Sequence, residues 1–328
     1  MSKPVYLFDV VGAIGDSLCT EPVLRYAIRN LPDEDIRILT NLPHLFQHLN
    51  KPMGSTWEEL GLEFGDPTVK HIFNRLELII DGQHVMHPIV RYITPHLTDP
   101  IDFISMLMMK RTMPDADKKI HLEFKDTTEK VESIVGGCLE DLTLVHVGTG
   151  APEKTRLFPE EYCNHLIDEL IGRGLKVAVI ATTDHRSHAT PIKNQSVINL
   201  VDKLKWDDFC TIISKAKILI TNDSSPVHLA SIFDNWIIAL PTVKHPDRLI
   251  HPRNGHRYHK AMALYKRLMC DDSTEIKIDQ IVSKFNWDGI DNFRDKYLAD
   301  PVVIARHARQ IATGLRDLIG GINPLNGG

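Results

Sequence analysis

Short apolar runs, each leading through a turn into a helix-like segment, constrain the fold of this chain most strongly. The first run, Val5–Val11 (VYLFDVV), is almost continuously apolar, as expected for a strand buried on both faces of a parallel sheet. Leu142–Val147 (LTLVHV) and Ile218–Thr221 (ILIT) have the same character. The sequence therefore predicts an α/β protein built from βα units in doubly wound sheets.

The chain of 328 residues is long enough for two such units. We expect a first Rossmann-like domain at residues 1–141, a second at residues 142–300, and a C-terminal helix with a tail at residues 301–328. The first 141 residues carry 14 Lys and Arg against 22 Asp and Glu. This negative charge argues mildly against a polyanionic acceptor docking on the first domain, although a local basic patch would reverse that argument.

Further elements follow from the same reasoning. Strands are predicted at Ile36–Thr40 and Leu76–Asp81, and helices at about Ser17–Asn30, at Pro159–Arg173 and from the turn at residue 225 to about Phe233. Prolines and histidines make residues 83–119 a loop-rich excursion. Within it, the patch Met106–Arg111 either touches a membrane surface or an acceptor, or forms a core helix with a solvated end.

The sequence also indicates a location and a redox state. No apolar run approaches the roughly 20 residues that span a bilayer, and the N-terminus leads directly into a strand without a signal-peptide core. We therefore expect a cytoplasmic protein. The five cysteines include no CxxC pair, which disfavours a zinc site and a disulfide framework.

Asp16 is the first candidate functional residue, because it follows the first predicted strand. Ligands of open α/β sheets bind at the carboxyl ends of strands, and Gly12 and Gly15 let a substrate approach the backbone closely. An aspartate there can accept a proton from a hydroxyl nucleophile. The alternative is that Asp16 caps the helix that follows.

The turn Asn222–His228 follows another apolar strand and opens a helix at Ser225 and Pro226. Backbone N–H groups at such a helix start form an anion site, to which Asp223, Ser224 and His228 contribute side chains. The alternative is an ordinary capped helix with His228 packed on its inner face.

The loop from Gly148 to Pro159 follows the strand that opens the second domain. Thr149 offers a hydroxyl group, and Lys154 and Arg156 offer cations, to a diphosphate. The alternative is a solvated loop.

Metal-binding signals are weak. Two DxD-like pairs, at Asp33–Asp35 and Asp115–Asp117, lie in charged stretches flanked by proline and are interpreted as solvated loops, so we expect no essential metal and no cofactor. Histidines and arginines also gather at residues 244–259. This basic loop lies either near a ligand or simply on the surface.

Taken in order, three stretches resemble glycosyltransferase family nine, the ADP-heptose:lipopolysaccharide heptosyltransferases and their relatives. Gly12–Ile28 is similar to the family's Gly-Asp turn with its following helix. Leu144–Leu170 is similar to its small-residue loop before a helix, with Arg156 where the family usually has lysine. Ala216–Phe233 is similar to the family's Asp-Ser/Thr-Gly-x-x-His turn, with Ser225 in place of glycine. No resemblance is found in residues 50–140 or 260–328.

This resemblance implies a GT-B architecture, with two Rossmann-like domains facing a central cleft, the first binding the acceptor and the second the donor. It implies an inverting, metal-independent sugar transfer from a nucleotide diphosphate sugar. Asp16 matches the general base. The positions that hold the donor diphosphate match Thr149, Lys154, Arg156, Asp223, Ser224, Ser225 and His228.

The acceptor stays open at this point, because a surface glycan, a protein, a small molecule and a modified nucleic acid are all compatible with the sequence. Two rival functions also remain. A nucleotide-sugar 2-epimerase would release an isomerised nucleotide sugar, whereas a non-catalytic nucleotide-sugar binding module would show neither transfer nor donor hydrolysis.

Overall fold

The computed structural model describes residues 3–74, 100–150, 156–183, 187–233, 235–240 and 299–314 with side chains, and 77–80, 83–86 and 261–263 by backbone alone. The described residues divide into two compact units, with the boundary between Glu123 and Phe124. The sequence predicts a boundary at residue 141, just before the first strand of the second sheet. Helix α3 (Thr128–Val135) comes before that strand and packs against a helix of the second unit.

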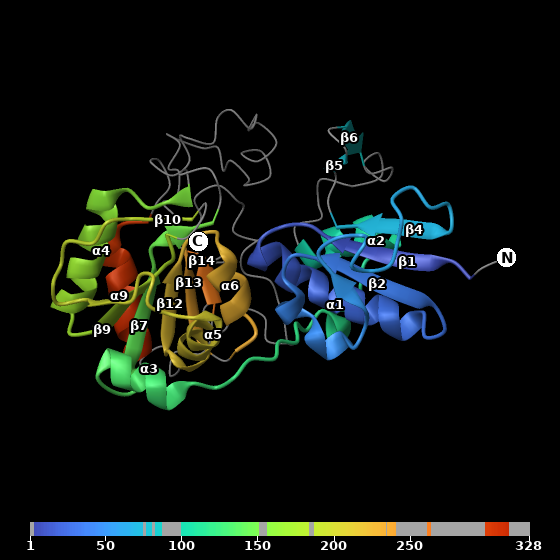
Figure 1. Cartoon of the computed structure of the whole chain (residues 1–328). Coiled ribbons are helices and arrows are strands. Elements are labelled where there is room, and N and C mark those ends of the chain that lie inside the picture. The colour runs from blue at the N-terminus through green and yellow to red at the C-terminus, as the bar shows by residue number, and fades with distance from the viewer. Residues whose placement is uncertain are drawn as a thin grey trace. The chain divides into compact units, whose positions relative to one another are not determined.

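The first unit contains a parallel four-stranded sheet with the order β3-β2-β1-β4 (Figure 1). Its strands are β1 (Val5–Val10), β2 (Asp35–Thr40), β3 (Met53–Gly54) and β4 (Val69–Phe73). Side chains alternate between the two faces. Leu7 packs under Leu60 and Leu62 on one face, whereas Phe8 and Ile38, whose side chains point the other way, are fully buried on the opposite face.

The fourth strand differs from the prediction. The segment expected as a strand at Leu76–Asp81 forms β5 (Glu77–Ile80), which pairs antiparallel with β6 (Gln83–Met86) in a separate hairpin. The strand that joins the sheet is instead β4, which pairs parallel with β1. Sequence reasoning missed it because Lys70 and His71 interrupt its apolar pattern.

Helix α1 (Ile14–Asn30) follows β1 and continues through Pro22. It begins one turn earlier than predicted, so Asp16 belongs to its first turn. Helix α2 (Pro100–Met109) packs along α1. It buries Leu107 and Met108, and the guanidinium of Arg111 lies 5.0 Å from the ring centroid of Tyr26. These contacts favour the core-helix interpretation of the Met106–Arg111 patch.

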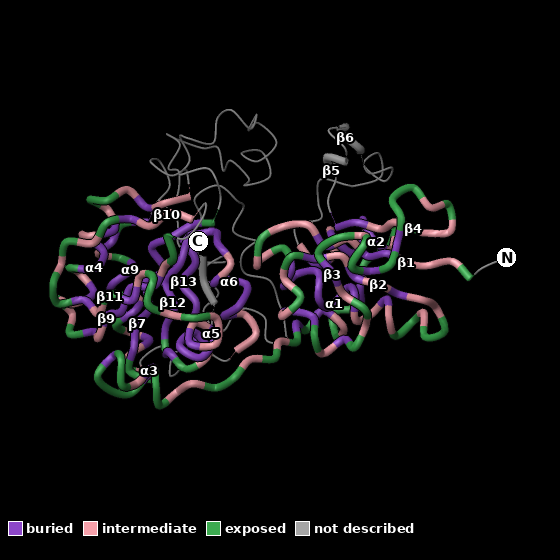
Figure 2. Tube along the Cα trace, in the orientation of Figure 1, coloured by how far each residue is buried: buried purple, intermediate pink, exposed green. Residues whose placement is uncertain are grey.

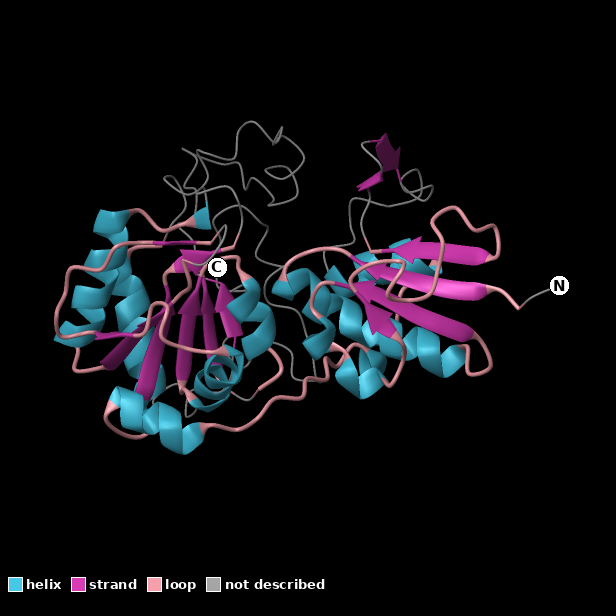
Figure 3. Ribbon diagram, in the orientation of Figure 1, coloured by secondary structure: helices cyan, strands magenta, loops and turns pink. Residues whose placement is uncertain are grey.

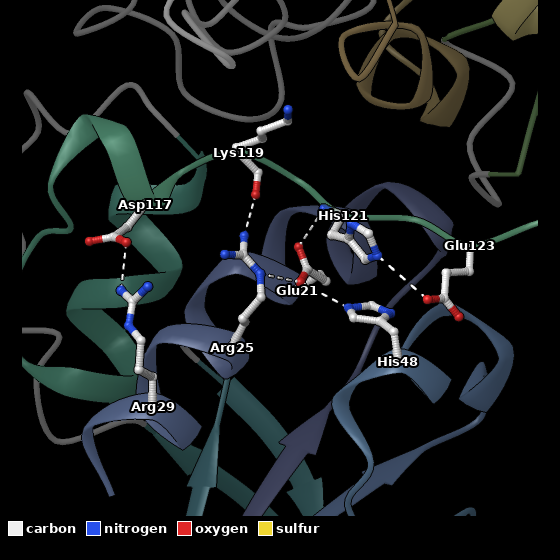
Figure 4. A network of polar contacts seen from close by, with 8 residues as sticks. All are labelled: Glu21, Arg25, Arg29, His48, Asp117, Lys119, His121 and Glu123. Carbon is white, nitrogen blue, oxygen red and sulfur yellow. Dashed lines mark hydrogen bonds and ion pairs between the residues drawn. The ribbon is translucent and has the colours of Figure 1, made fainter. Parts of the chain in front are cut away.

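A buried carboxylate in α1, that of Glu21, links this helix to residues 119–121, which lie near the boundary between the two units in the sequence (Figure 4). Glu21 is 1% exposed, and its Oε1 accepts from Arg25 Nε at 2.8 Å and lies 3.1 Å from His48 Nε2. Its Oε2 accepts the backbone N–H of His121 at 2.8 Å. Arg25 also donates to the carbonyl of Lys119. Because a buried charge is tolerated only when it is paired in this way, this network holds residues 119–121 firmly on α1.

The second unit contains a parallel six-stranded sheet with the order β11-β9-β7-β12-β13-β14. Figure 3 shows its strands in magenta, with helices in cyan around them. These strands are β7 (Leu142–His146), β9 (Lys176–Ile180), β11 (Ile198–Asn199), β12 (Ile218–Thr221), β13 (Trp236–Ala239) and β14 (Ala261–Ala263). A separate short pair joins β8 (Gly148–Thr149) to β10 (His188–Ala189) in antiparallel register.

Helices complete the layers of this unit. α4 (Glu160–Gly172) packs against α9 (Pro301–Ala312), while α5 (Trp206–Lys215) packs against α3 and α6 (Ser225–Ala230). Leu166, Ile220 and Ile304 meet in the core between α4, α9 and the sheet. Figure 2 colours β7, β12 and most of β13 in this sheet as buried. The sequence also predicts a helix at Glu275–Phe285, a segment that lies outside the described residues.

Helix α6 is shorter than predicted, because it ends at Ala230 instead of about Phe233. The Ser231 hydroxyl donates to the carbonyl of His228 at 2.6 Å, and Ile232 and Phe233 form tighter turns with i→i−3 hydrogen bonds. Among the described residues, no helix combines the length and the apolar character needed to cross a membrane.

Candidate functional site

The strand order of the second sheet places two predicted segments side by side. From β7 the chain moves outward through β9 to β11, and then returns to β12 on the other side of β7. Ligands of open α/β sheets bind at the carboxyl ends of the strands where the order reverses in this way. Gly148–Gly150 leaves β7 and Asn222–Ser225 leaves β12, so both segments lie at this reversal.

Asn222, which the sequence analysis gave no individual role, joins these two segments. Its side chain is 0% exposed, and its Nδ2 donates to the carbonyl of Gly148 at 3.0 Å and to the carbonyl of Arg156 at 2.6 Å. Its Oδ1 lies 3.3 Å from His146 Nδ1. A polar residue directly after a fully buried strand was the only signal in the sequence that could have found it.

Arg156 and Asp223, which are both predicted to hold the diphosphate, contact each other. Arg156 donates from Nη1 to the carbonyl of Asp223 at 3.4 Å, and its Nε lies 3.9 Å from Asp223 Oδ2. The Asp223 side chain is fully buried, whereas the Arg156 side chain is 24% exposed. Arg156 Nε is itself buried and has no hydrogen-bond partner among the described residues. A buried donor without an acceptor is costly unless a ligand or water completes it.

The start of α6 offers one backbone donor to an anion. Ser224 is the N-cap residue and its side chain makes no capping hydrogen bond. Its N–H donates to the carbonyl of Asn222, and the N–H of Val227 donates to the carbonyl of Ser224. Pro226 has no N–H. Among residues 224–227, Ser225 is therefore the residue whose N–H donates no hydrogen bond within the turn.

The remaining donor-site candidates are placed as follows. Thr149 is 3% exposed and belongs to β8, opposite His188. His228 lies in α6 and is 7% exposed. Lys154 and the basic loop at residues 244–259 lie outside the described residues. The structure thus brings Arg156, Asp223 and the turn before α6 together. Thr149 directly follows Gly148, whose carbonyl accepts from Asn222.

In the first unit, Asp16 is exposed in the first turn of α1, at the carboxyl end of β1. The N-cap residue of this helix is Ala13, so Asp16 is not the N-cap. Gly12 has a φ of 138°, a backbone conformation that favours glycine and turns the chain from β1 into α1. Gly15, predicted as part of this turn, lies instead inside the helix.

Asn74 supports the Asp16 turn. It directly follows β4, and its Oδ1 accepts the N–H of Val11 at 3.0 Å. Its Nδ2 donates to Thr20 Oγ1 at 3.0 Å, and that hydroxyl donates to the carbonyl of Asp16 at 2.7 Å. The order β3-β2-β1-β4 reverses between β1 and β4. In both units, therefore, an asparagine after the neighbouring strand holds the segment that leaves the first strand.

Three of the four aspartates in the DxD-like pairs form ion pairs. Asp35 pairs with Arg37 at 2.8 Å, Asp117 with Arg29 at 2.5 Å and Asp115 with Lys118 at 2.9 Å. Arg37 lowers the pKa of Asp35 through its hydrogen bonds and charge. Within the described part of the chain, no group of three or more His, Cys, Asp or Glu side chains is arranged to hold a metal ion.

Comparison with known families identifies the segment that carries the donor-site candidates. The family described as "Glycosyltransferase family 9 (heptosyltransferase)" matches residues 109–264. This segment is therefore similar to glycosyltransferase family 9. The match includes Thr149, Arg156 and the turn before α6, and it begins within residues 50–140, where sequence reasoning found no resemblance. It does not include Asp16. A comparison with curated proteins finds no match.

Solved structures show the same fold. The family 9 glycosyl transferase from Veillonella parvula DSM 2008 is 14% identical with a TM-score of 0.57, covering 94% of this chain and 97% of that one. ADP-heptose LPS heptosyltransferase II of E. coli is 12% identical with a TM-score of 0.56, covering 94% and 99%. The iron-containing dodecameric glycosyltransferase TibC, from enterotoxigenic E. coli H10407, is 12% identical with a TM-score of 0.60, covering 95% and 77%.

At these identities the structural likeness shows the fold, which is the GT-B type of the heptosyltransferases. The family 9 match adds what the fold alone does not, because many unrelated functions share Rossmann-like units. Together they support a glycosyltransferase activity for this chain.

Gly148 tests how tightly the segment after β7 is packed. A Cβ atom there would lie 2.9 Å from Ala181 Cβ and 3.1 Å from the carbonyl oxygen of His188. We expect Gly148→Ala to lower the free energy of unfolding by about 1–3 kcal/mol, measured by urea denaturation. Gly172→Ala is the matched control, because a Cβ there meets nothing within 4 Å. Equal free energies of unfolding for the two variants would show that the segment after β7 accommodates the added methyl group without strain.

His146 predicts a pH dependence. Burial lowers its pKa from 6.5 to about 4, against the opposing effect of the Asn222 hydrogen bond, so the folded ring is neutral near pH 7. Between about pH 4 and 6.5 the unfolded chain binds more protons at this histidine. The free energy of unfolding should therefore fall as the pH is lowered through this window, by on the order of 3 kcal/mol.

The measurement is urea denaturation at several pH values, for the wild type and for His146→Asn, in which the residue cannot titrate. The wild type should lose more stability than the variant between pH 6.5 and 4. Parallel curves for the two proteins would mean that His146 does not control this loss.

Proposed function

We propose that this chain is an inverting glycosyltransferase that needs no metal ion and moves a sugar from a nucleoside diphosphate sugar to an acceptor hydroxyl. The carrying observation is that the family 9 segment supplies both turns at the strand-order reversal of the second sheet. Arg156 is there with a buried Nε that has no hydrogen-bond partner in the described structure. A diphosphate oxygen would complete it.

In this proposal the donor diphosphate binds Arg156, the N–H of Ser225 and the hydroxyl of Thr149, with Lys154, Asp223, Ser224 and His228 in supporting roles. The guanidinium carries its charge in a partly buried place, where its interaction with the leaving diphosphate strengthens as negative charge develops on that group. Arginine in place of lysine allows two parallel hydrogen bonds to phosphate oxygens.

Asp16 is the proposed general base. It accepts the proton of the acceptor hydroxyl while the hydroxyl oxygen forms a bond to the anomeric carbon. The bond between that carbon and the diphosphate oxygen breaks, and its electron pair leaves with the nucleoside diphosphate. Attack from the side opposite the leaving group inverts the anomeric configuration. The exposure of Asp16 at the end of β1 suits contact with an acceptor.

For the donor, we propose an ADP-sugar first, because TibC, a structure with this fold and a TM-score of 0.58, is described in complex with ADP-D-beta-D-heptose. The proposed acceptor is a surface glycan. A protein, a small molecule or a modified nucleic acid are tested as alternative acceptors, and peripheral contact with a membrane is tested by adding lipid-linked glycans.

The experiment is a hydrolysis and thermal-shift screen with ADP-, UDP-, GDP- and dTDP-sugars, followed by transfer assays with the candidate acceptors. We expect one donor to raise the melting temperature and to release its nucleoside diphosphate together with a glycoconjugate of inverted configuration. Binding without either product would make the chain a binding module. We expect the transfer activity to persist in EDTA. A strict requirement for added Mg²⁺, Mn²⁺ or iron would contradict metal independence.

Asp16→Asn tests the base directly. We expect the transfer rate to fall by about 10²–10⁴-fold, while the melting temperature and donor affinity stay near those of the wild type. Asp33→Asn is the matched control, because Asp33 is also exposed but lies before β2, at the opposite edge of the sheet. A near-normal transfer rate for Asp16→Asn would assign proton removal to another group.

A further inference from the structure

We propose that Asn222 is a positioning residue for donor binding, because it sets the place from which Arg156 reaches the diphosphate. The inference rests on the proposed function, which gives Arg156 its ligand. It concerns a residue that touches neither donor nor acceptor in that mechanism.

Asn222 and Asp223 hold Arg156 at its backbone and at its guanidinium group, respectively. Asn222 Nδ2 donates to the Arg156 carbonyl at 2.6 Å, which fixes the backbone. Asp223 accepts from Arg156 Nη1 through its carbonyl and faces Arg156 Nε through its carboxylate, which fixes the guanidinium. Asn222 and Asp223 directly follow β12, which is a central strand of the sheet. Their contacts therefore fix the position of Arg156 relative to that strand.

The chemistry at position 222 requires an amide. One NH₂ group has two hydrogens, and both are used, toward the carbonyls of Gly148 and Arg156. An oxygen in place of that nitrogen would face two carbonyl oxygens at these distances and be repelled. The neutral His146 ring fixes the same orientation, because its Nδ1 can donate to Asn222 Oδ1.

Complete burial makes these contacts costly to lose. Asn222 is 0% exposed, so its removal leaves the carbonyls of Gly148 and Arg156 without this donor in a place that bulk water does not reach. The Arg156 backbone is then free to shift. Small displacements of a charged group weaken bidentate contacts with phosphate strongly, since these depend on direction as well as on distance.

Asn222→Ala is the test variant. We expect it to bind the nucleoside diphosphate at least about tenfold more weakly, and to bind the corresponding monophosphate nearly as well as the wild type. Dissociation constants are measured by calorimetry, with whichever of ADP, UDP, GDP and dTDP the wild type binds most tightly. In transfer assays the KM for the donor should rise, whereas the KM for the acceptor should not.

Three further variants separate positioning from general loss of stability. Asn222→Asp keeps the shape but replaces the donor nitrogen by oxygen, so it should bind the diphosphate no better than Asn222→Ala. Asn222→Ser keeps one hydroxyl donor and serves if Asn222→Ala does not fold. Asn235→Ala is the matched control, because Asn235 is also buried and donates to a carbonyl, that of Ile213, before β13. It should lose stability but not diphosphate affinity.

A double-mutant cycle with Arg156→Ala decides whether Asn222 acts through Arg156. If it does, removing Asn222 in the Arg156→Ala background should change diphosphate affinity by less than about twofold, because the two losses are not additive. Fully additive losses, or equal losses for diphosphate and monophosphate, would overturn the proposal. The failure of the proposed function looks different, since Arg156→Ala alone would then leave diphosphate affinity unchanged.

Discussion

The reversal of strand order beside the first strand of each sheet is the constraint on which the candidate sites depend. In the second unit the order reverses between the paired strands β7 and β12, and the turns that leave these two strands are joined by the buried amide of Asn222. In the first unit the order reverses between the paired strands β1 and β4, and Asn74 connects the turn after β1 to Thr20 of α1. Both sites therefore rest on buried polar contacts between neighbouring strand ends.

Much of this arrangement could be predicted from the sequence. The apolar runs at β1, β7 and β12 identified the α/β class, and the family resemblance at Ala216–Phe233 is confirmed by the family 9 match. The strand β4 was missed because a short strand with Lys70 and His71 has no clear periodicity. The early start of α1 was missed because Gly15 was interpreted as part of a turn, although glycine is tolerated in the first turn of a helix.

The polar supports could not be predicted in the same way. Asn74, Glu21 and Asn222 are separated by 63 to 100 residues from some of their partners, and a single sequence contains no signal for such pairs. The general result is that local patterns locate strands, turns and charged candidates. Which buried side chains hold those candidates in place depends on tertiary contacts, and these are also the contacts most sensitive to a single substitution.

The central claim is that the donor diphosphate binds at the strand-order reversal of the second sheet. A crystal structure of the chain with bound nucleoside diphosphate tests it most directly. The account predicts phosphate oxygens within hydrogen-bonding distance of the Arg156 guanidinium and of the Ser225 N–H, with the Asn222 amide still on the carbonyls of Gly148 and Arg156. A diphosphate bound wholly by residues of the first unit, or lying farther from Arg156 than one side-chain length, would contradict it.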